Sequence, residues 1–299
     1  VVTRNLGHKR TLLNIRSTSQ VLGVIGDPIA HSFSPDMHNA AIEALGVDFC
    51  YVAFHVLSSN VGDAMRGVRG FQIRGLNVTI PHKPSVMEHM DRISEEALAV
   101  GAVNTISNED GELVGYNTDV YGVLTALERV AGLSTLSSHC VVLGAGGASR
   151  AVVYALGTRN EVDRVTILNR TVERAEALAE DMSKITGKQI SVAPMEAGTQ
   201  VRVFADAGLV VNTTSLGMYP YVDASPLLDI KAVHPDLVLY DTVFNPLETR
   251  LMREFQAAGA PAYRGLEMLV FQGARSFAIW TGLEPPTDVM KEVVVRRFA

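Results

Sequence analysis

The stretch Val141–Arg150, with the sequence VVLGAGGASR, decides the fold of this 299-residue chain. An apolar strand leads into three glycines and then into a helical pattern over residues 151–156. Such a loop presents backbone N–H groups at a helix N-terminus, where they can bind a pyrophosphate. Ser149 stands where the G-x-G-x-x-G pattern has its third glycine. A purely structural turn is the alternative, but the flanking strand and helix favour a dinucleotide-binding fold.

The sequence on both sides of this loop alternates short apolar runs with amphipathic helical patterns. This rhythm predicts an α/β protein with two successive units, connected by a helix over residues 119–131. The expected strands of the second unit, a doubly wound parallel sheet, are 140–143, 164–168, 209–212 and 237–241. The expected elements of the first unit are strands 21–25, 51–56 and 75–80, helices 35–45 and 83–90, and a hairpin turn at Asn108–Gly111.

Composition and charge exclude several classes of protein. With 47% hydrophobic and 19% charged residues, the chain has the composition of a compact globular protein. Its net charge of −6 gives no general attraction to nucleic acid or anionic lipid, and no run approaches the roughly 20 apolar residues of a membrane span. We therefore expect a small-molecule partner, no nucleic acid and no membrane. Cys50 and Cys140 lack a C-x-x-C spacing, which favours buried thiols in a reducing cytoplasm over a disulfide or a metal site.

The beginning of the chain differs in charge from the rest. Residues 1–20 contain four Lys or Arg residues and no acidic residue. We expect a disordered extension without function, because basic termini are often unstructured. The remnant of a targeting segment is the alternative.

The second predicted strand of the dinucleotide unit ends in Leu168-Asn169-Arg170-Thr171. An NAD-binding fold normally has an Asp or Glu here to bind the ribose 2′-hydroxyl, and this chain has none. Arg170 offers a forked cation and Thr171 a hydroxyl, and both groups suit the oxygens of a 2′-phosphate. The sequence therefore predicts NADP as the cofactor. A solvated surface arginine is the alternative for Arg170.

Four polar clusters follow predicted strands of the first unit. They are HSFSP at 31–35, NVTIPHK at 77–83, AVNT at 102–105 and GYNTD at 115–119. Because the carboxyl ends of strands line the ligand crevice in open α/β sheets, these hydroxyl, amide, Lys and Asp groups are expected to converge on a polyhydroxylated acid. His31, His38 and His82 show no metal-binding spacing such as H-E-x-x-H, so we expect local hydrogen bonds and no metal.

In their order and spacing, these clusters resemble those of the shikimate dehydrogenase family. The resemblance also includes residues 141–150, 169–171, 212–218 and 265–273, and it extends over nearly the whole chain from Val21 onward. It implies a two-domain α/β fold with a Rossmann-type NADP domain. The implied division is a substrate domain at 21–120, the NADP domain at 121–264, and C-terminal helices at 265–299 that return to the substrate domain, after the extension 1–20.

The resemblance also implies roles for individual residues. Lys83 and Asp119 match the catalytic pair, with Lys83 as general acid/base. Ser32 and Ser34 match serines that bind the substrate carboxylate, whereas Thr79, Asn104 and Gln272 match residues that bind ring hydroxyls, in addition to the catalytic pair. The residues implied to bind the cofactor are Gly144, Ala145, Gly146, Gly147, Ala148, Asn169, Arg170, Thr171, Thr213, Ser215, Met218, Val243 and Gly265.

Each of these side chains also has an ordinary structural interpretation. Ser32 and Ser34 could form a helix cap before Pro35, Lys83 could be a solvated helix residue, and Asp119 could be an N-cap. Backbone hydrogen bonding is the alternative for Thr79, Asn104 and Gln272. One residue departs from the family, because many relatives carry a tyrosine at the position of Phe244.

The activity implied by the resemblance is the reversible NADPH-dependent reduction of 3-dehydroshikimate to shikimate, a step of aromatic amino-acid and chorismate biosynthesis. A quinate or dual quinate/shikimate dehydrogenase is the nearest alternative. A catalytically silent ligand-binding protein on the same fold is an alternative of another class. A different Rossmann oxidoreductase would leave the polar clusters of the first unit unexplained. The expected partner is therefore shikimate or 3-dehydroshikimate, and a homodimer is compatible with the sequence.

Overall fold

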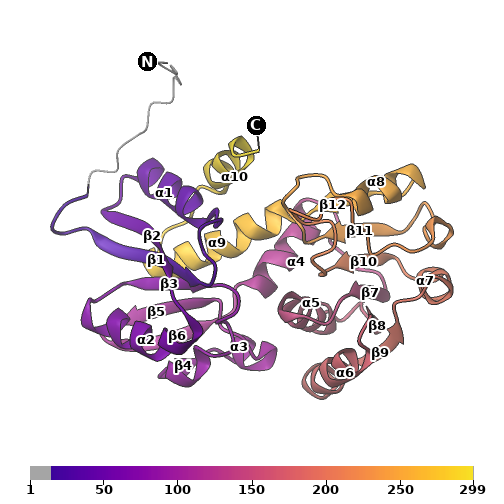
Figure 1. Cartoon of the computed structure of the whole chain (residues 1–299), viewed down its shortest axis with the longest axis horizontal. Coiled ribbons are helices and arrows are strands. Elements are labelled where there is room, and N and C mark those ends of the chain that lie inside the picture. The colour runs from indigo at the N-terminus through magenta and orange to yellow at the C-terminus, as the bar shows by residue number, and fades with distance from the viewer. Residues whose placement is uncertain (1–14, 299) are drawn as a thin grey trace.

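The chain folds into two α/β lobes, each built on a six-stranded sheet, in the computed structural model, which describes residues 15–298 (Figure 1). The predicted fold class is confirmed. The first lobe contains the sheet with strand order β2-β1-β3-β5-β6-β4, and the second lobe contains the sheet with order β12-β11-β10-β7-β8-β9. α4 and α9 run side by side where the lobes meet.

The first sheet is mixed. β1 pairs with β2 and β3 in parallel, whereas β5 pairs with β3 and β6 in antiparallel fashion. The hairpin between β5 and β6 turns at Asp110 and Gly111, which both have positive φ, as the predicted turn requires. Its strands are β1 (Gln20–Gly26), β2 (Phe49–His55), β3 (Gly75–Val78), β4 (Arg92–Ile93), β5 (Thr105–Glu109) and β6 (Glu112–Tyr116).

The second sheet is parallel throughout and is buried on both faces. Along β7, Cys140 and Val142 face the core shared with α4, α5 and α6, whereas Val141 and Leu143 face the core shared with α7 and α8. The strand order reverses beside β7, which places a ligand crevice at its carboxyl end. Its strands are β7 (His139–Leu143), β8 (Arg164–Asn169), β9 (Gln189–Pro194), β10 (Leu209–Asn212), β11 (Val238–Asp241) and β12 (Ala262–Arg264).

The structure contains the predicted helices except one, and it adds α2 and α3 to the first lobe. The expected helix over residues 83–90 is wrong: turns and a short 3₁₀ segment, Met87–His89, occupy this stretch. Pro84 explains the difference, because proline restricts the preceding residue and offers no N–H to a helix. The α-helices are α1 (Ser34–Leu45), α2 (Val61–Gly70), α3 (Glu95–Val100), α4 (Asp119–Arg129), α5 (Gly147–Gly157), α6 (Val172–Thr186), α7 (Ala197–Phe204), α8 (Arg250–Ala257), α9 (Leu266–Thr281) and α10 (Thr287–Arg296).

The last two helices pack on the first lobe although they follow the second lobe in sequence (Figure 1). α10 lies against α1, and α9 buries Trp280 against the first sheet. The Trp280 indole N–H donates to the carbonyl oxygen of Ile106 at 2.9 Å. Gly75 leaves room for this ring, because a Cβ there would lie 2.1 Å from Trp280 Nε1.

The expected extension over residues 1–20 lies mostly outside the described residues. Thr18 and Ser19 both donate side-chain hydrogen bonds to the carboxylate of Asp48, and β1 already begins at Gln20. The prediction of disorder therefore extended too far along the chain. Both cysteines are buried and unpaired, as expected. Among the described residues, no helix has both the length and the apolar character that crossing a membrane requires.

His38 lies in the core of the first lobe. It is fully buried on α1 and stacks on Tyr51 with 4.3 Å between ring centroids. Neither ring nitrogen has a hydrogen-bond partner among residues 15–298, so the expected local hydrogen bond of His38 is wrong. Burial lowers the pKa of His38 to about 3, against a smaller opposing effect of the Asn77 side chain.

We expect the free energy of unfolding to decrease as the pH falls from about 6.5 towards 3, at up to ~1.4 kcal/mol per pH unit from this residue. In that window the unfolded chain binds a proton at His38 and the folded chain does not, so acid favours unfolding. His38→Leu removes the titrating group without leaving an unpaired polar atom. Urea unfolding across this pH range should therefore show a shallower dependence for the variant. Equal slopes for both proteins would contradict the assignment.

Candidate active site

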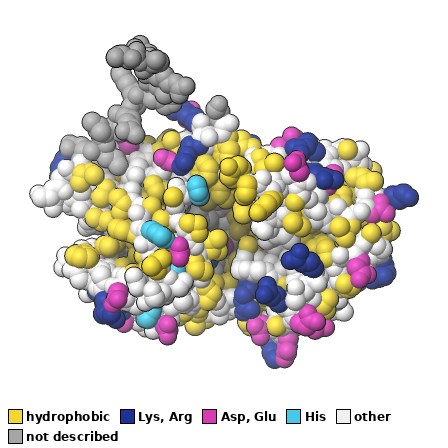
Figure 2. All heavy atoms as spheres, in the orientation of Figure 1, with side chains coloured by type: hydrophobic (Ala, Val, Ile, Leu, Met, Phe, Trp, Pro, Cys, Tyr) yellow, Lys and Arg dark blue, Asp and Glu magenta, His cyan; other side chains and the backbone are white. Residues whose placement is uncertain are grey.

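A cavity of about 350 Å³ lies between the two lobes, at the carboxyl ends of strands of the first sheet. The loops after β1 and β3 and the first residue of α4 form its wall on the first lobe. Gln272 of α9 and Ala148, Thr242 and Gly265 of the second lobe also line the cavity. Figure 2 shows a hollow between the lobes with hydrophobic side chains along its rim.

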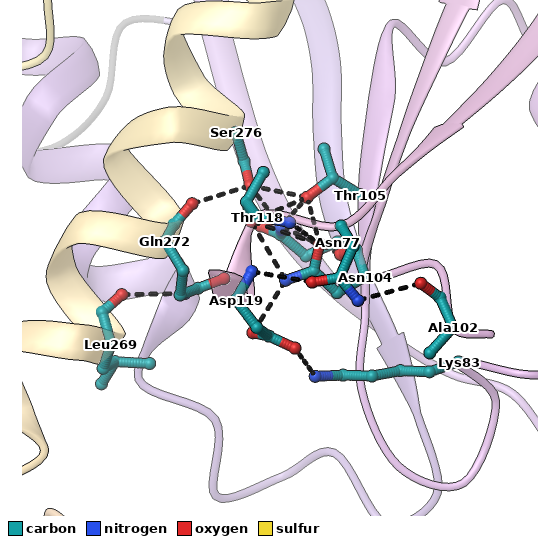
Figure 3. A network of polar contacts seen from close by, with 11 residues as sticks. Asn77, Lys83, Ala102, Asn104, Thr105, Thr118, Asp119, Leu269, Gln272 and Ser276 are labelled. Carbon is teal, nitrogen blue, oxygen red and sulfur yellow. Dashed lines mark hydrogen bonds and ion pairs between the residues drawn. The ribbon is translucent and has the colours of Figure 1, made fainter. Parts of the chain in front are cut away.

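Lys83 and Asp119 meet in this cavity. Lys83 Nζ donates to Asp119 Oδ2 at 2.7 Å, and the two side chains are 24% and 11% exposed (Figure 3). Lys83 lies in a turn, not in a solvated helix, and Thr118 occupies the N-cap position that Asp119 could have held. As the first residue of α4, Asp119 also benefits from the partial positive charge of the helix N-terminus. Asp119 can therefore hold the Lys83 ammonium group in a fixed orientation beside a bound ligand.

Asn104 binds the second oxygen of the same carboxylate. Its Nδ2 donates to Asp119 Oδ1 at 2.8 Å, and its Oδ1 accepts the Thr118 backbone N–H at 2.7 Å. The orientation of the amide is therefore fixed, because a backbone N–H can only donate. Asn104 is 2% exposed and is not among the residues that line the cavity. Its contact with a ring hydroxyl stays a prediction.

The other predicted substrate residues, Ser32, Ser34, Thr79 and Gln272, all line the cavity. The Ser34 backbone N–H donates to Ser32 Oγ at 3.2 Å, so both hydroxyls lie within one turn. Phe33 occupies the N-cap position of α1 and its side chain makes no capping hydrogen bond. The helix-cap interpretation therefore holds for Ser32, which accepts the first N–H of the helix, and not for Ser34.

An aromatic wall lies beside these serines. Phe244 lines the cavity and meets the ring of Phe33 edge-on at 5.6 Å. Phe298 stacks on Phe33 at 5.2 Å, and the Arg297 guanidinium lies 4.6 Å from the centre of the same ring. No tyrosine is among the described residues that line the cavity, so this wall offers no phenolic hydroxyl.

Asn77 and His31 are polar lining residues to which sequence reasoning gave no role. Asn77 belongs to a quoted cluster, and the structure shows its side chain in the cavity wall, where its Oδ1 accepts the Tyr51 hydroxyl at 2.7 Å. His31 also lines the cavity. His82 makes the expected local hydrogen bond, with Nε2 2.6 Å from the Val56 carbonyl oxygen. Within residues 15–298, no three His, Cys, Asp or Glu side chains are grouped to hold a metal ion.

A second cavity of about 540 Å³ lies at the carboxyl ends of β7, β8 and β10. Gly144 has a φ of +106°, and a Cβ there would lie 2.9 Å from Thr213 Oγ1, so both conformation and space require glycine. Ser149, which stands for the third glycine of the motif, accepts the Gly146 N–H at 2.9 Å and lies 2.6 Å from Thr213 Oγ1. This serine therefore stabilises the loop and does not block it.

Arg170 lines the same cavity together with Asn169 and Thr171. The structure adds Arg174, one turn into α6, which sequence reasoning missed although its spacing from Arg170 is helical. Neither arginine forms an ion pair with a carboxylate of the described chain. Two unpaired guanidinium groups beside a glycine loop fit an additional phosphate.

The remaining predicted cofactor residues divide into three groups. Ala145, Thr213 and Ser215 line the second cavity, whereas Ala148 and Gly265 line the first. The end of the glycine loop thus reaches the cavity that contains Lys83. Gly147, Met218 and Val243 line neither cavity, and their contact with NADP stays a prediction.

Three family models match the chain in sequence order. They are the shikimate dehydrogenase substrate binding domain over residues 24–106, shikimate / quinate 5-dehydrogenase over 126–215, and the shikimate 5′-dehydrogenase C-terminal domain over 265–295. A curated protein of Methanopyrus kandleri, named shikimate dehydrogenase (NADP(+)), is 43% identical over 286 residues, which cover 96% of this chain and 98% of the relative. The chain belongs to the shikimate dehydrogenase family.

Solved structures of the shikimate dehydrogenase family have the same architecture. A crystal structure of shikimate dehydrogenase in complex with NADP+ is 40% identical, with a TM-score of 0.90 over 95% of this chain and 98% of that chain. Quinate dehydrogenase from Corynebacterium glutamicum in complex with NAD is 30% identical, with a TM-score of 0.86 over 93% and 99%. The predicted shikimate dehydrogenase family is thus confirmed, and an unrelated Rossmann oxidoreductase is excluded.

Proposed function

We propose that this chain catalyses the reversible NADPH-dependent reduction of 3-dehydroshikimate to shikimate. One observation carries the proposal: the Lys83–Asp119 pair lies in a cavity that Ala148, in the first turn of α5 after the glycine loop, also lines. A proton donor and the reactive end of a dinucleotide would therefore meet at one ligand. Shikimate, the substrate of the oxidative direction, is named in curated relatives such as that of Methanopyrus kandleri.

In this reaction Lys83 acts as general acid and base. When bound, NADPH supplies the hydride to the ketone carbon. The Lys83 ammonium donates a proton to the carbonyl oxygen, and the neutral amine accepts it back in the oxidative direction. Asp119, 2.7 Å away, keeps Lys83 Nζ directed at that oxygen. Asn104, which donates to Asp119 Oδ1, keeps the carboxylate in place.

The cavity also provides for the rest of the substrate. Ser32 and Ser34 would donate hydroxyl hydrogens to the carboxylate. Thr79 and Gln272 would bind ring hydroxyls, and Asn104 could join them by giving up one of its present contacts. Phe244 would enclose the carboxylate end without contributing a hydrogen bond.

NADP would bind in the second cavity, across the carboxyl end of β7. Gly144 and Gly146 offer close backbone approach to the pyrophosphate, and Arg170 and Arg174 offer charge to the 2′-phosphate. We further propose that residues 21–120 with 265–299 act as the substrate-binding unit and 121–264 as the cofactor-binding unit. The two buried free thiols support a reducing cytoplasm as the location.

An assay of the purified chain with shikimate or quinate, each with NADP or NAD, tests the proposal. We expect the highest kcat/KM for shikimate with NADP, measured by the absorbance of the reduced nicotinamide. A preference for quinate would favour the dual or quinate dehydrogenase alternative. Binding without turnover for every pair would favour a silent ligand-binding protein and would refute the catalytic proposal.

A further inference from the structure

A network of buried hydroxyl and amide groups lies behind the Lys83–Asp119 pair (Figure 3). It joins Ser276 of α9 to Thr105 of β5 and Thr118 at the start of α4. These three residues are at most 2% exposed, and none lines the cavity. They have no place in the mechanism above, so their arrangement requires a separate explanation.

The hydrogen atoms of this network can be assigned. Thr105 donates its one hydroxyl hydrogen to Asn104 Oδ1 at 3.0 Å, so its oxygen accepts from Ser276 at 2.7 Å. Ser276 Oγ in turn accepts the amide of Asn77 at 3.0 Å, and the Gln272 carbonyl oxygen, also at 3.0 Å, is a second acceptor for the Ser276 hydrogen. A continuous series of donors thus runs from Asn77 through Ser276 and Thr105 to Asn104, which gives a buried network its rigidity.

The network continues to the catalytic carboxylate through Asn104. Thr105 Oγ1 lies 3.0 Å from Asn104 Oδ1, and Thr118 Oγ1 accepts from Asn104 Nδ2 at 3.0 Å. Asn104 Nδ2 in turn donates to Asp119 Oδ1, and the other oxygen of this carboxylate, Oδ2, accepts from Lys83 Nζ. A displacement of either threonine hydroxyl would therefore turn the amide that orients Asp119.

We propose that Ser276, Thr105 and Thr118 are positioning residues for the Lys83–Asp119 pair. They link α9, which carries Gln272 into the cavity, to the carboxylate that orients the proton donor. The inference rests on the function proposed above and assigns it three further residues. Because Ser276 lies on the same helix as Gln272 and contacts the Thr105 hydroxyl at 2.7 Å, one side of the substrate site and the catalytic pair keep a fixed separation.

The same strand provides a contrast that separates positioning from ordinary packing. Ser107, two residues after Thr105 on β5, buries its hydroxyl without a partner among the described residues. Removing that hydroxyl deletes a buried polar group but does not disturb Asp119. Ser107→Ala is thus a matched control for a loss of hydroxyl at Thr105.

The experiment compares Thr105→Val, Ser276→Ala and Thr105→Ser with the unchanged protein and with Ser107→Ala. We expect Thr105→Val and Ser276→Ala to lower kcat for ketone reduction about tenfold, because small misplacements of reacting groups are costly. The KM for NADPH should not change, since the cofactor cleft is untouched. Thr105→Ser keeps the hydroxyl and should recover kcat to within about twofold, and Ser107→Ala should remain at the level of the unchanged protein.

An isotope effect distinguishes positioning from a loss of folded protein. With NADPH deuterated at the transferred position, slower chemistry raises the primary isotope effect on kcat in Thr105→Val and Ser276→Ala. A lower fraction of folded enzyme reduces kcat and leaves this effect unchanged. A lowered kcat with an unchanged isotope effect, or kcat unaffected in both variants, would overturn the inference. If the protein without any substitution shows no activity, the proposed function is refuted, and the inference is refuted with it.

Discussion

Replacing Lys83 by alanine is expected to lower kcat by at least about a hundredfold with only a modest change in KM, because loss of a proton shuttle typically costs about 10²–10⁴ in rate. Among the described residues, Lys83 Nζ has one carboxylate partner, Asp119, and both side chains line the cavity. Steady-state kinetics in both directions measure the effect. A raised KM with normal kcat would instead assign Lys83 a binding role, and the proton would have to come from another group.

Two further variants sharpen this result. Lys83→Met keeps most of the side-chain stem, so it should match the alanine variant if the ammonium group is what matters. Asp119→Asn should lower kcat by itself, because the amide no longer attracts the ammonium. The double variant should be little worse than the worse single one, since residues that act as a unit are not additive. If the fold-losses in kcat of the two single variants multiplied in the double variant, Lys83 and Asp119 would act independently, and the assignment of a catalytic pair would be wrong.

Replacing Arg170 by aspartate should raise the KM for NADP at least about thirtyfold while the KM for NAD changes little. The new carboxylate would repel the 2′-phosphate and could accept the 2′-hydroxyl of NAD instead. Arg174 should keep part of the affinity for NADP, because it lines the same cavity. Steady-state titration of each cofactor at saturating shikimate measures both constants.

Arg202→Asp is the matched control for this charge reversal. Arg202 is an exposed arginine on α7 of the same lobe and lines neither cavity, so its reversal changes the net charge equally. Both KM values should remain those of the unchanged protein. If Arg170→Asp weakens NADP and NAD alike, the arginine supports the loop and does not select the phosphate.

Local sequence patterns were sufficient for β1, β2 and β3 of the first sheet and for β7, β8, β10 and β11 of the second. The core strand β7 is buried on every residue and enters a glycine loop, so its signal is strong. β9 was missed, because no residue of this edge strand is fully buried and its apolar pattern is weak. The false helix at 83–90 shows the opposite error, in which helical periodicity outweighed the proline at position 84.

The site was predictable where a short motif follows a strand. Lys83 and Asp119 each follow a strand of the first sheet, so the crevice rule brings them together. Ser276 could not be found in this way, because its partners Asn77 and Thr105 are 199 and 171 residues away in sequence. Its helix reads as apolar core, and only the three-dimensional fold shows which polar groups it meets. Arg174 could not be found from the strand-end motif, because it lies in α6 beyond that motif.

The packing of α9 and α10 on the first lobe has a consequence for the order of events during synthesis. The strands of the first sheet are synthesised before the second lobe, but Trp280, which covers Gly75 and binds Ile106, is synthesised only after it. The second lobe, continuous from β7 to β12, can fold in between. A chain released before residue 265 would therefore keep a foldable second lobe beside a first sheet that lacks its cover. The lobe that is made first is the one completed last.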